Sequence, residues 1–169
     1  MLLAADQRYS CAKCGRGCRR TTVPITAGEA EAYRTLGPDY DDAFEPIPGY
    51  EPLLRIRKNA DGACVFLLDD GLCRIHKEMG FDRKPLACRL FPFSFHPAEG
   101  DVVVTTSFAC PAVIANEGDS VRSQTRELRV LHAAWAREHP EPPARVELVR
   151  GHVLPRPALI ALRGFLTKI

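Results

Sequence analysis

The sequence predicts a small α+β fold, with short strands and turns in the first two thirds and helices in the last third. Three observations support this prediction. Short β-branched or alternating segments in the first part are separated by glycine and proline turns. A long amphipathic pattern of helical period occurs near residues 119–138. The length of 169 residues suits one domain, or one domain with a short appendage.

The first elements are indicated by β-branched residues and by a helix-capping signal. Residues 21–25 predict a brief strand. Thr26 and Glu29 have the spacing of a capping box, which predicts a helix that ends near Leu36. The residues that follow, 38–52, are rich in proline and acidic side chains, and we expect a solvated loop there.

Short elements continue through the middle of the chain, separated by turn sequences that contain glycine, asparagine and aspartate. The elements expected are strands over 53–58 and 64–68, a short helix over 74–79, a helical turn after Pro85, and strands over 91–95 and 102–108. The run 64–68 is apolar throughout, which predicts a buried strand.

The last third is expected to be mostly helical. An amphipathic helix over 119–138 is followed by a proline-rich linker, a strand over 146–149 and a last helix over 158–169. The last helix is apolar on one side and ends on Ile169. It either folds back on the core or docks on a partner subunit, because an apolar helical face needs a covering surface.

Composition and charge exclude several classes of protein. The chain has 23 basic and 21 acidic residues, and a net charge of +2 argues against a protein built to grip nucleic acid. No stretch reaches the ~20 apolar residues of a membrane span. The apolar start stops at Asp6, which differs from a signal peptide and predicts a cytoplasmic protein.

Seven cysteines are the outstanding feature of the composition. Their positions are Cys11, Cys14, Cys18, Cys64, Cys73, Cys88 and Cys110. In a reducing compartment, clustered and odd-numbered cysteines indicate metal binding or redox chemistry in place of a disulfide framework. Their distribution predicts a metal-stabilised, cysteine-rich domain over residues 1–115 and a helical extension over 116–169 that packs on it.

The N-terminal cluster has the spacing of a metal knuckle. Cys11 and Cys14 are separated by two residues, and Cys18 follows closely. Gly15 and Gly17 allow positive φ angles, which bring backbone amides toward the sulfurs. The first twenty residues hold five basic side chains and one acidic side chain, a charge that offsets several thiolates.

The number of cysteines leaves the metal and its stoichiometry open. Four thiolates complete a structural zinc site or an iron–sulfur cluster, and seven are one short of two such sites. His76 or His96 could supply an eighth ligand, one thiolate could bridge two metals, or Cys64 could be core packing. We therefore expect Cys14→Ser or Cys88→Ser to be more damaging than Cys64→Ser.

The pattern of cysteines resembles the YkgJ-like cysteine-cluster family. The segments that carry the resemblance are Cys11-x-x-Cys14-Gly-x-x-Cys18, Gly-x-Cys64-x-Phe-Leu, Gly-x-Cys73-x-Ile-His and Lys-Pro-x-x-Cys88-Arg-x-Phe-Pro-Phe, within residues 9–111. The resemblance implies a zinc- or iron-chelating domain, and a relation to the longer flagellin lysine methylases. The family's first cluster is Cys-x-x-Cys-x-x-Cys-Cys, whereas Gly17 stands here in place of its third cysteine.

The residues themselves point to no particular reaction. Phosphate-binding loops, nucleophile elbows and zinc-protease helices are absent from the sequence. The interpretations that remain are a metal-binding protein that holds zinc or an iron–sulfur cluster and has a protein partner, a cluster-dependent methyltransferase, and a thiol redox or metal-delivery protein.

Overall fold

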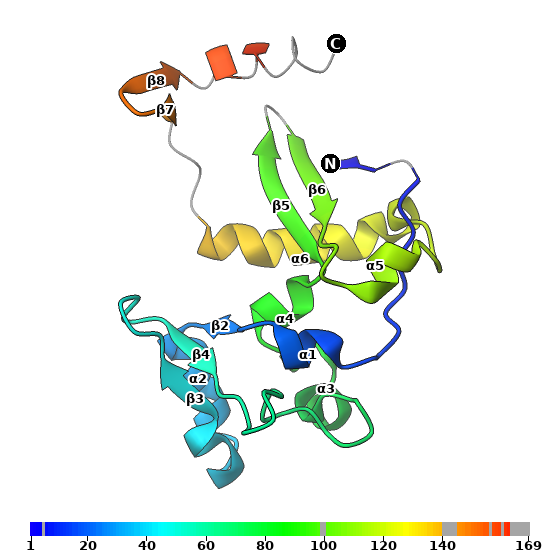
Figure 1. Ribbon diagram of the computed structural model, residues 1–169, viewed down its shortest axis with the longest axis vertical. Helices are drawn as coiled ribbons and strands as arrows, with labels where there is room; N and C mark the ends of the chain where they lie inside the picture. The colour runs from blue at the N-terminus through cyan, green and yellow to red at the C-terminus, as the bar shows by residue number, and fades with distance from the viewer. Residues whose placement is uncertain (5, 99–100, 140–144, 156, 160, 163–169) are drawn as a thin grey trace.

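Two three-stranded sheets, each beside its own hydrophobic core, organise this protein (Figure 1). The structure is a computed structural model that describes residues 1–169 except 5, 99–100, 140–144, 156, 160 and 163–169. The cores are separate groups of buried side chains, one built mainly from residues 25–75 and the other from residues 93–131. The mixture of helices and small sheets confirms the α+β class.

The first sheet is antiparallel, with the strand order β2-β4-β3. Its elements, with the helices beside it, are β2 (Pro24–Ile25), α2 (Ala27–Arg34), η1 (Pro38–Ala43), β3 (Phe44–Pro46) and β4 (Leu54–Ile56). The side chain of Thr26 accepts from the Glu29 backbone N–H at 3.1 Å, and the Glu29 carboxylate accepts from the Thr26 N–H at 3.1 Å. The predicted capping box is confirmed in both directions.

The prediction of a solvated loop over 38–52 is wrong for its first half. Residues 38–46 form η1 and β3, because Tyr40 and Phe44 place their rings in the first core. These rings pack with those of Tyr33 and Phe66 at centroid separations of 5.5–6.1 Å. Aromatic burial therefore overrides the loop signal of the acidic and proline residues.

The apolar run 64–68 is partly buried, as the sequence predicted, but it does not form the predicted strand. Phe66 is 3% exposed, yet the run forms isolated bridges, Lys58–Cys64 and Leu67–Cys73, and no continuous strand ladder. The segment is a series of turns that place Cys64 and Phe66 inward. Its burial comes from side-chain packing, without a strand ladder.

Short helices connect the two cores. They are α1 (Arg16–Arg20), α3 (Arg74–Met79), η2 (Phe81–Arg83) and α4 (Leu86–Leu90). The helices over 74–79 and after Pro85 were expected, whereas α1 was not. The helix α4 contacts both β2 and the long helix α6 (Thr125–Glu138), so it lies at the junction of the two halves (Figure 1).

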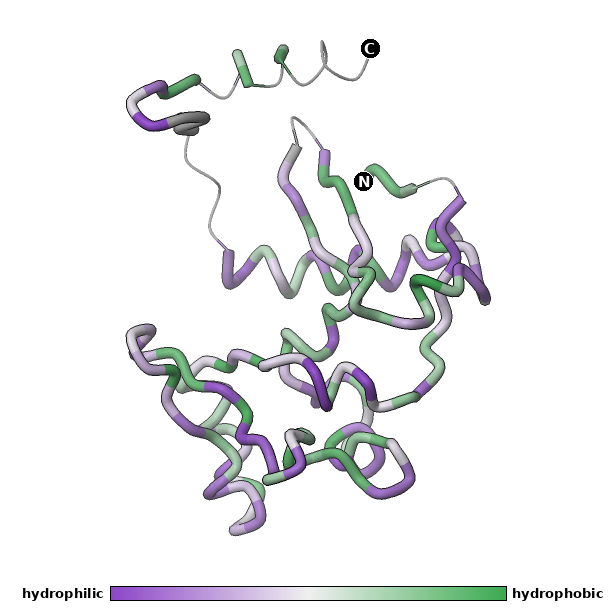
Figure 2. Tube along the Cα trace, viewed as in Figure 1, coloured by the Kyte–Doolittle hydropathy of each residue, from purple (hydrophilic) through white to green (hydrophobic). Residues whose placement is uncertain are grey.

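The second sheet has the order β1-β6-β5 and packs against α6. Its strands are β1 (Leu2–Leu3), β5 (Phe93–Ala98) and β6 (Asp101–Thr106), followed by α5 (Pro111–Ala115) and η3 (Val121–Gln124). The two predicted strands are found with shifted bounds, and the predicted amphipathic helix over 119–138 begins at Thr125, after the short helix η3. Leu128 and Leu131 pack with Phe95 and Val104. Figure 2 shows hydrophilic and hydrophobic residues alternating along α6.

The C-terminal part contains a hairpin of β7 (Arg145–Val149) and β8 (His152–Pro155). The strand over 146–149 was expected, and its partner was not. The predicted last helix over 158–169 falls partly outside the described residues, although 157–159 and 161–162 are helical. In the part of the chain that the structure describes, no helix has the length and apolarity to cross a membrane.

Candidate metal centre

Four cysteines from four separate segments lie at the edge of the first core. We call Cys18, Cys64, Cys73 and Cys88 the inner thiol set. Cys18 lies in α1, Cys73 caps the start of α3, and Cys88 lies in α4. Cys64 is 7% exposed, and the other three are half-buried against the same core. Folding thus brings together thiols that span seventy positions of the sequence.

The inner thiols influence one another's protonation. Burial raises the pKa of Cys64 to about 11, opposed by a backbone hydrogen bond at Phe66 and reinforced by the charges of Cys18 and Cys73. Burial raises the pKa of Cys88 to about 12, and Cys64, Cys73 and Cys18 add to the rise. Burial and then Cys73 raise the pKa of Cys18. The four side chains therefore share one electrostatic environment.

Backbone hydrogen bonds hold this set in place. The Cys64 N–H donates to the Cys18 carbonyl at 2.8 Å, which ties α1 to the turn before Phe66. Glu29 reaches beyond its own helix, since its carboxylate also accepts from the Leu86 N–H at 3.1 Å. The same side chain that caps α2 therefore positions α4, the helix that carries Cys88.

Positive charge surrounds the inner thiol set. Lys58 donates to the Cys18 carbonyl at 2.6 Å, and Lys58 and Lys84 both act to lower the pKa of Cys18. The Arg89 side chain, next to Cys88, has a buried Nε with no hydrogen-bond partner among the described residues. A buried N–H without a partner is costly, and an anionic metal–thiolate complex nearby would compensate it.

The inner set therefore fits a thiophilic metal by its chemistry. It provides four thiols, which is the complete donor set of a structural zinc site or of a four-iron cluster, together with charge-compensating cations. Among the described residues, no three His, Cys, Asp or Glu side chains converge as a ready coordination shell. Coordination would therefore require the thiols to rotate toward a common centre.

The remaining cysteines form a second and more exposed group. We call Cys11, Cys14 and Cys110 the outer thiol set. Cys11 and Cys14 are exposed, and Cys110 is buried at the start of α5. Burial raises the pKa of Tyr9, and Cys11, Cys110 and Cys14 all add to this rise, so the three cysteines lie around one phenol. Cys14 also raises the pKa of Cys18, and it stands between the two sets.

The outer set is held together by contacts between the N-terminus and residues 116–124. The Tyr9 N–H donates to the Asp119 carbonyl at 2.8 Å, and Gln124 donates to the Tyr9 carbonyl at 2.7 Å. The Arg8 N–H donates to the Asn116 side chain at 2.7 Å. These bonds fix the segment before Cys11 beside the helix that follows Cys110.

The knuckle between Cys11 and Cys14 differs in one detail from the prediction. Lys13 and Gly15 have positive φ angles of 51° and 64°, so the turn is left-handed as expected at Gly15. Gly17 is instead part of α1, and a Cβ built there would lie 3.4 Å from the Phe91 ring. Its small size serves packing against Phe91, and the prediction of positive φ there is wrong.

The two histidines considered as ligands lie elsewhere. His76 is exposed, and its ring meets the edge of the Phe81 ring at 5.8 Å. His96 hydrogen-bonds with Thr105 across the β5–β6 hairpin at 3.0 Å. No local motif marks Tyr9 or Lys58, which folding brings to the thiols. Lys84 and Arg89, in contrast, belong to the Lys-Pro-x-x-Cys88-Arg segment.

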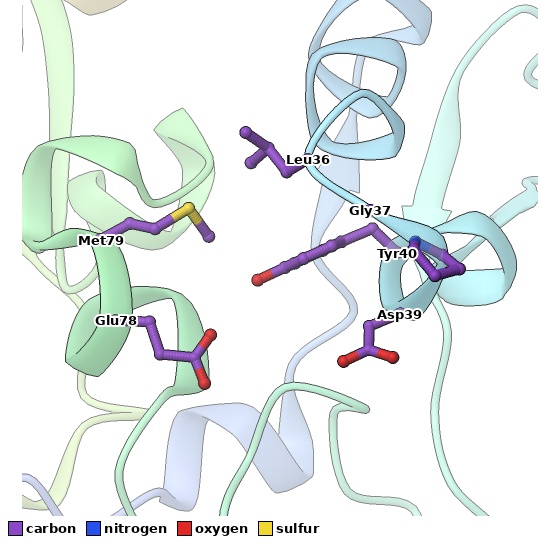
Figure 3. Close-up of a pocket in the computed structure, with 7 residues that line it drawn as sticks. Leu36, Gly37, Asp39, Tyr40, Glu78 and Met79 are labelled. Atoms are coloured by element: carbon purple, nitrogen blue, oxygen red, sulfur yellow. The ribbon is translucent and has the colours of Figure 1, made fainter.

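One hollow lies between the segment that follows α2, which includes the start of η1, and the end of α3. It has a volume of about 460 Å³, and its lining includes Leu36, Asp39, Tyr40, Glu78 and Met79. Figure 3 shows the Tyr40 phenol extending toward Met79 and Glu78. Burial and then the Glu78 carboxylate raise the pKa of Tyr40. Without a cysteine in its lining, this hollow offers no thiol ligand.

The pattern of cysteines agrees with a known family. A family model described as "Putative zinc- or iron-chelating domain" matches residues 10–117. The chain belongs to this family. All seven cysteines lie within the matched range, and so do both thiol sets. The expected resemblance is thereby confirmed.

The chain is also similar to three other proteins. An uncharacterized protein of Methanocaldococcus jannaschii is 52% identical over 56 residues, which is 33% of this chain and 19% of the relative. A lysine-N-methylase of Salmonella typhimurium is 28% identical over 130 residues, 68% of this chain and 32% of the relative. A flagellar biosynthetic protein of Salmonella muenchen is 35% identical over 66 residues, 37% of this chain and 39% of the relative. This chain thus spans between 19% and 39% of their lengths. No solved structure matches the chain.

Proposed function

We propose that this protein binds metal through its seven cysteines, with the inner thiol set as the principal site. The observation that carries the proposal is the meeting of Cys18, Cys64, Cys73 and Cys88 at the edge of one core. Their elements share few local interactions, so a metal ion would link α1, α3 and α4 directly. Such a link supplies folding free energy that the small first core lacks.

The inner set would hold zinc or an iron–sulfur cluster, since four thiolates suit both. When bound, a zinc ion would act as a structural cross-link, and an iron–sulfur cluster would add electron-transfer capacity. Lys58 and Lys84 hold positive charge beside the sulfurs, and Arg89, the neighbour of Cys88 in the chain, has a buried Nε. These cations favour the ionised thiols that any such metal requires.

The outer thiol set is proposed as a second metal site with fewer protein ligands. Cys11, Cys14 and Cys110 provide three thiols, and the two exposed cysteines make the site accessible to solvent. Three ligands leave a coordination position for water or an external group, as open metal sites do. Exchangeable metal and free thiols both suit a reducing, cytoplasmic environment.

Protein purified without oxygen tests the proposal through its metal and acid-labile sulfide content and its visible spectrum. We expect metal bound in proportion to protein, with either zinc alone or iron together with sulfide. Chelation of the metal should lower the unfolding temperature. Metal-free protein that folds with the same unfolding temperature in the presence and absence of zinc or iron would contradict the proposal.

Methyl transfer is a second candidate, supported by the similarity to the lysine-N-methylase over 68% of this chain. The matched part is 32% of that protein. Incubation of metal-loaded protein with a labelled methyl donor and lysine-containing polypeptides tests this candidate. Transfer of the label to lysine would support methyl transfer. If no label is transferred by protein that still contains its metal, the result would favour a metal-binding protein without this activity.

A further inference from the structure

A second hollow lies between α1 and α5, and its rim combines exposed apolar and basic side chains. It has a volume of about 360 Å³. The residues that line it are Arg16, Arg20, Phe108, Ala109, Pro111, Ile114 and Ala115. Phe108 is 71% exposed and Ile114 is 65% exposed, so two large apolar side chains meet solvent at one place. We call this feature the α1–α5 hollow.

The charge of the α1–α5 hollow is positive. Arg16 and Arg20 are four positions apart on α1, a spacing that places two side chains on one helix face. Both are exposed, and within the described part of the chain neither makes an ion pair, whereas Arg19 pairs with Asp61 at 3.0 Å. Two guanidinium groups are therefore available beside Phe108 and Ile114.

Both walls of the hollow are attached to the thiol sets. The helix α1 contains Cys18 of the inner set and follows Cys14 of the outer set. Cys110 of the outer set is the cap residue of α5 and lies between the lining residues Ala109 and Pro111. Metal bound at these cysteines would fix the positions of α1 and α5. In this respect the inference rests on the proposed function.

We propose that the α1–α5 hollow docks a partner polypeptide in which acidic residues flank a large apolar side chain. Arginine and aromatic side chains are enriched in protein interfaces and supply much of their binding energy. The high exposure of Phe108 and Ile114 makes the site shallow, which suits a polypeptide segment better than an enclosed small molecule. The two arginines select acidic partners by charge complementarity.

A fluorescein-labelled peptide that alternates glutamate with leucine and phenylalanine is the probe for this surface. We expect saturable binding to the metal-loaded protein by fluorescence anisotropy, and weaker binding at high salt. The variant Phe108→Ser/Ile114→Ser and the variant Arg16→Glu/Arg20→Glu should each weaken binding by about tenfold or more. The same peptide with lysine in place of glutamate should bind far more weakly.

The matched control is Arg129→Glu/Val130→Ser, which changes an exposed arginine and an exposed apolar residue on α6. This control should bind the probe as the unchanged protein does. Equal binding by the hollow variants, or an equal loss in the control, would overturn the inference. Metal content is measured on every sample. A protein that contains metal but does not bind the probe would overturn the docking surface alone. A protein that binds the probe specifically but contains no metal would support the docking surface and contradict the proposed metal site.

Discussion

The two thiol sets differ in how the fold surrounds them. The inner set lies against the first core, and burial together with the charges of neighbouring thiols raises the pKa values of Cys18, Cys64 and Cys88. The outer set joins an exposed turn to the start of α5, with two of its three thiols in solvent. The comparison teaches that cysteines close in sequence can lie in different surroundings, because Cys14 is exposed whereas Cys18 is half-buried against the first core. We expect the inner set to stabilise the fold and the outer set to exchange its metal.

The largest expected effect comes from removing an inner ligand. Cys88→Ser should abolish metal binding at the inner set and lower the free energy of unfolding by roughly 3 kcal/mol or more, since structural metal contributes on the order of 10 kcal/mol in small domains. Thermal unfolding and metal analysis measure both effects. Cys14→Ser is the matched control at an exposed position, and it should leave the inner metal in place.

The structure reverses the expectation for Cys64. The sequence suggested a mild effect for Cys64→Ser, but this thiol is buried within the inner set. We now expect Cys64→Ser to approach Cys88→Ser in severity and to exceed Cys14→Ser. An unfolding temperature closer to that of Cys14→Ser would show that Cys64 serves only as core packing.

The second prediction concerns how the stability of the protein and the metal affinity of the inner thiol set depend on pH. Folding raises the pKa of Cys64 to about 11 and that of Cys88 to about 12, from a usual value of 9.0. In metal-free protein, this stabilisation is present below about pH 9 and is lost as the pH rises through the folded pKa values. Metal requires the thiolates, so its affinity should increase with pH. The difference in Tm between metal-loaded and metal-free protein should therefore grow from about pH 6 to about pH 9. A constant difference would mean that the inner thiols are not ligands.

The third prediction concerns the carboxylate that joins α2 to the inner set. Glu29→Ala removes the bonds to Thr26 and Leu86 together, and it should cost about 1–2 kcal/mol and weaken inner-site metal affinity. Glu31→Ala, on the same helix, removes only a 3.5 Å surface pair with Arg34 and should change stability by about 0.5 kcal/mol or less. Equal metal affinity in the two variants would contradict the role of Glu29 in positioning α4.

The smallest expected effect tests the outer turn. Gly15→Ala places a Cβ 3.0 Å from Leu67 in a left-handed residue, and it should cost about 1 kcal/mol and perturb the Cys11–Cys14 knuckle. Gly28→Ala adds a Cβ in open space on α2 and should stabilise the protein by up to about 1 kcal/mol. Chemical denaturation of both variants measures the difference. A neutral Gly15→Ala would show that the turn relaxes without strain.

Local signals explain which elements the sequence predicts correctly. The capping box at Thr26 and the hairpin over 93–106 depend on neighbouring residues, and both are found as expected. The segments over 38–46 and 64–68 depend on distant partners instead. Tyr40, Phe44 and Phe66 join one aromatic cluster, and that packing decides their backbone more than their own propensities do.

The sequence predicted the candidate site as a list of candidate ligands and not as an arrangement. Spacing singled out the seven cysteines, and the family match covers all of them. The division into inner and outer sets depends on how α1, α4 and α5 pack, which no local motif records. The cation at Lys58 and the phenol of Tyr9 are also brought to the thiols only by folding.

The central claim is that the inner thiol set binds metal independently of the outer set. The most direct measurement is the metal content and unfolding temperature of the triple variant Cys11→Ser/Cys14→Ser/Cys110→Ser. We predict that this protein retains the inner metal and loses stability when a chelator removes it. A triple variant that folds without metal, and whose unfolding temperature is unchanged by added zinc or iron, would contradict the account.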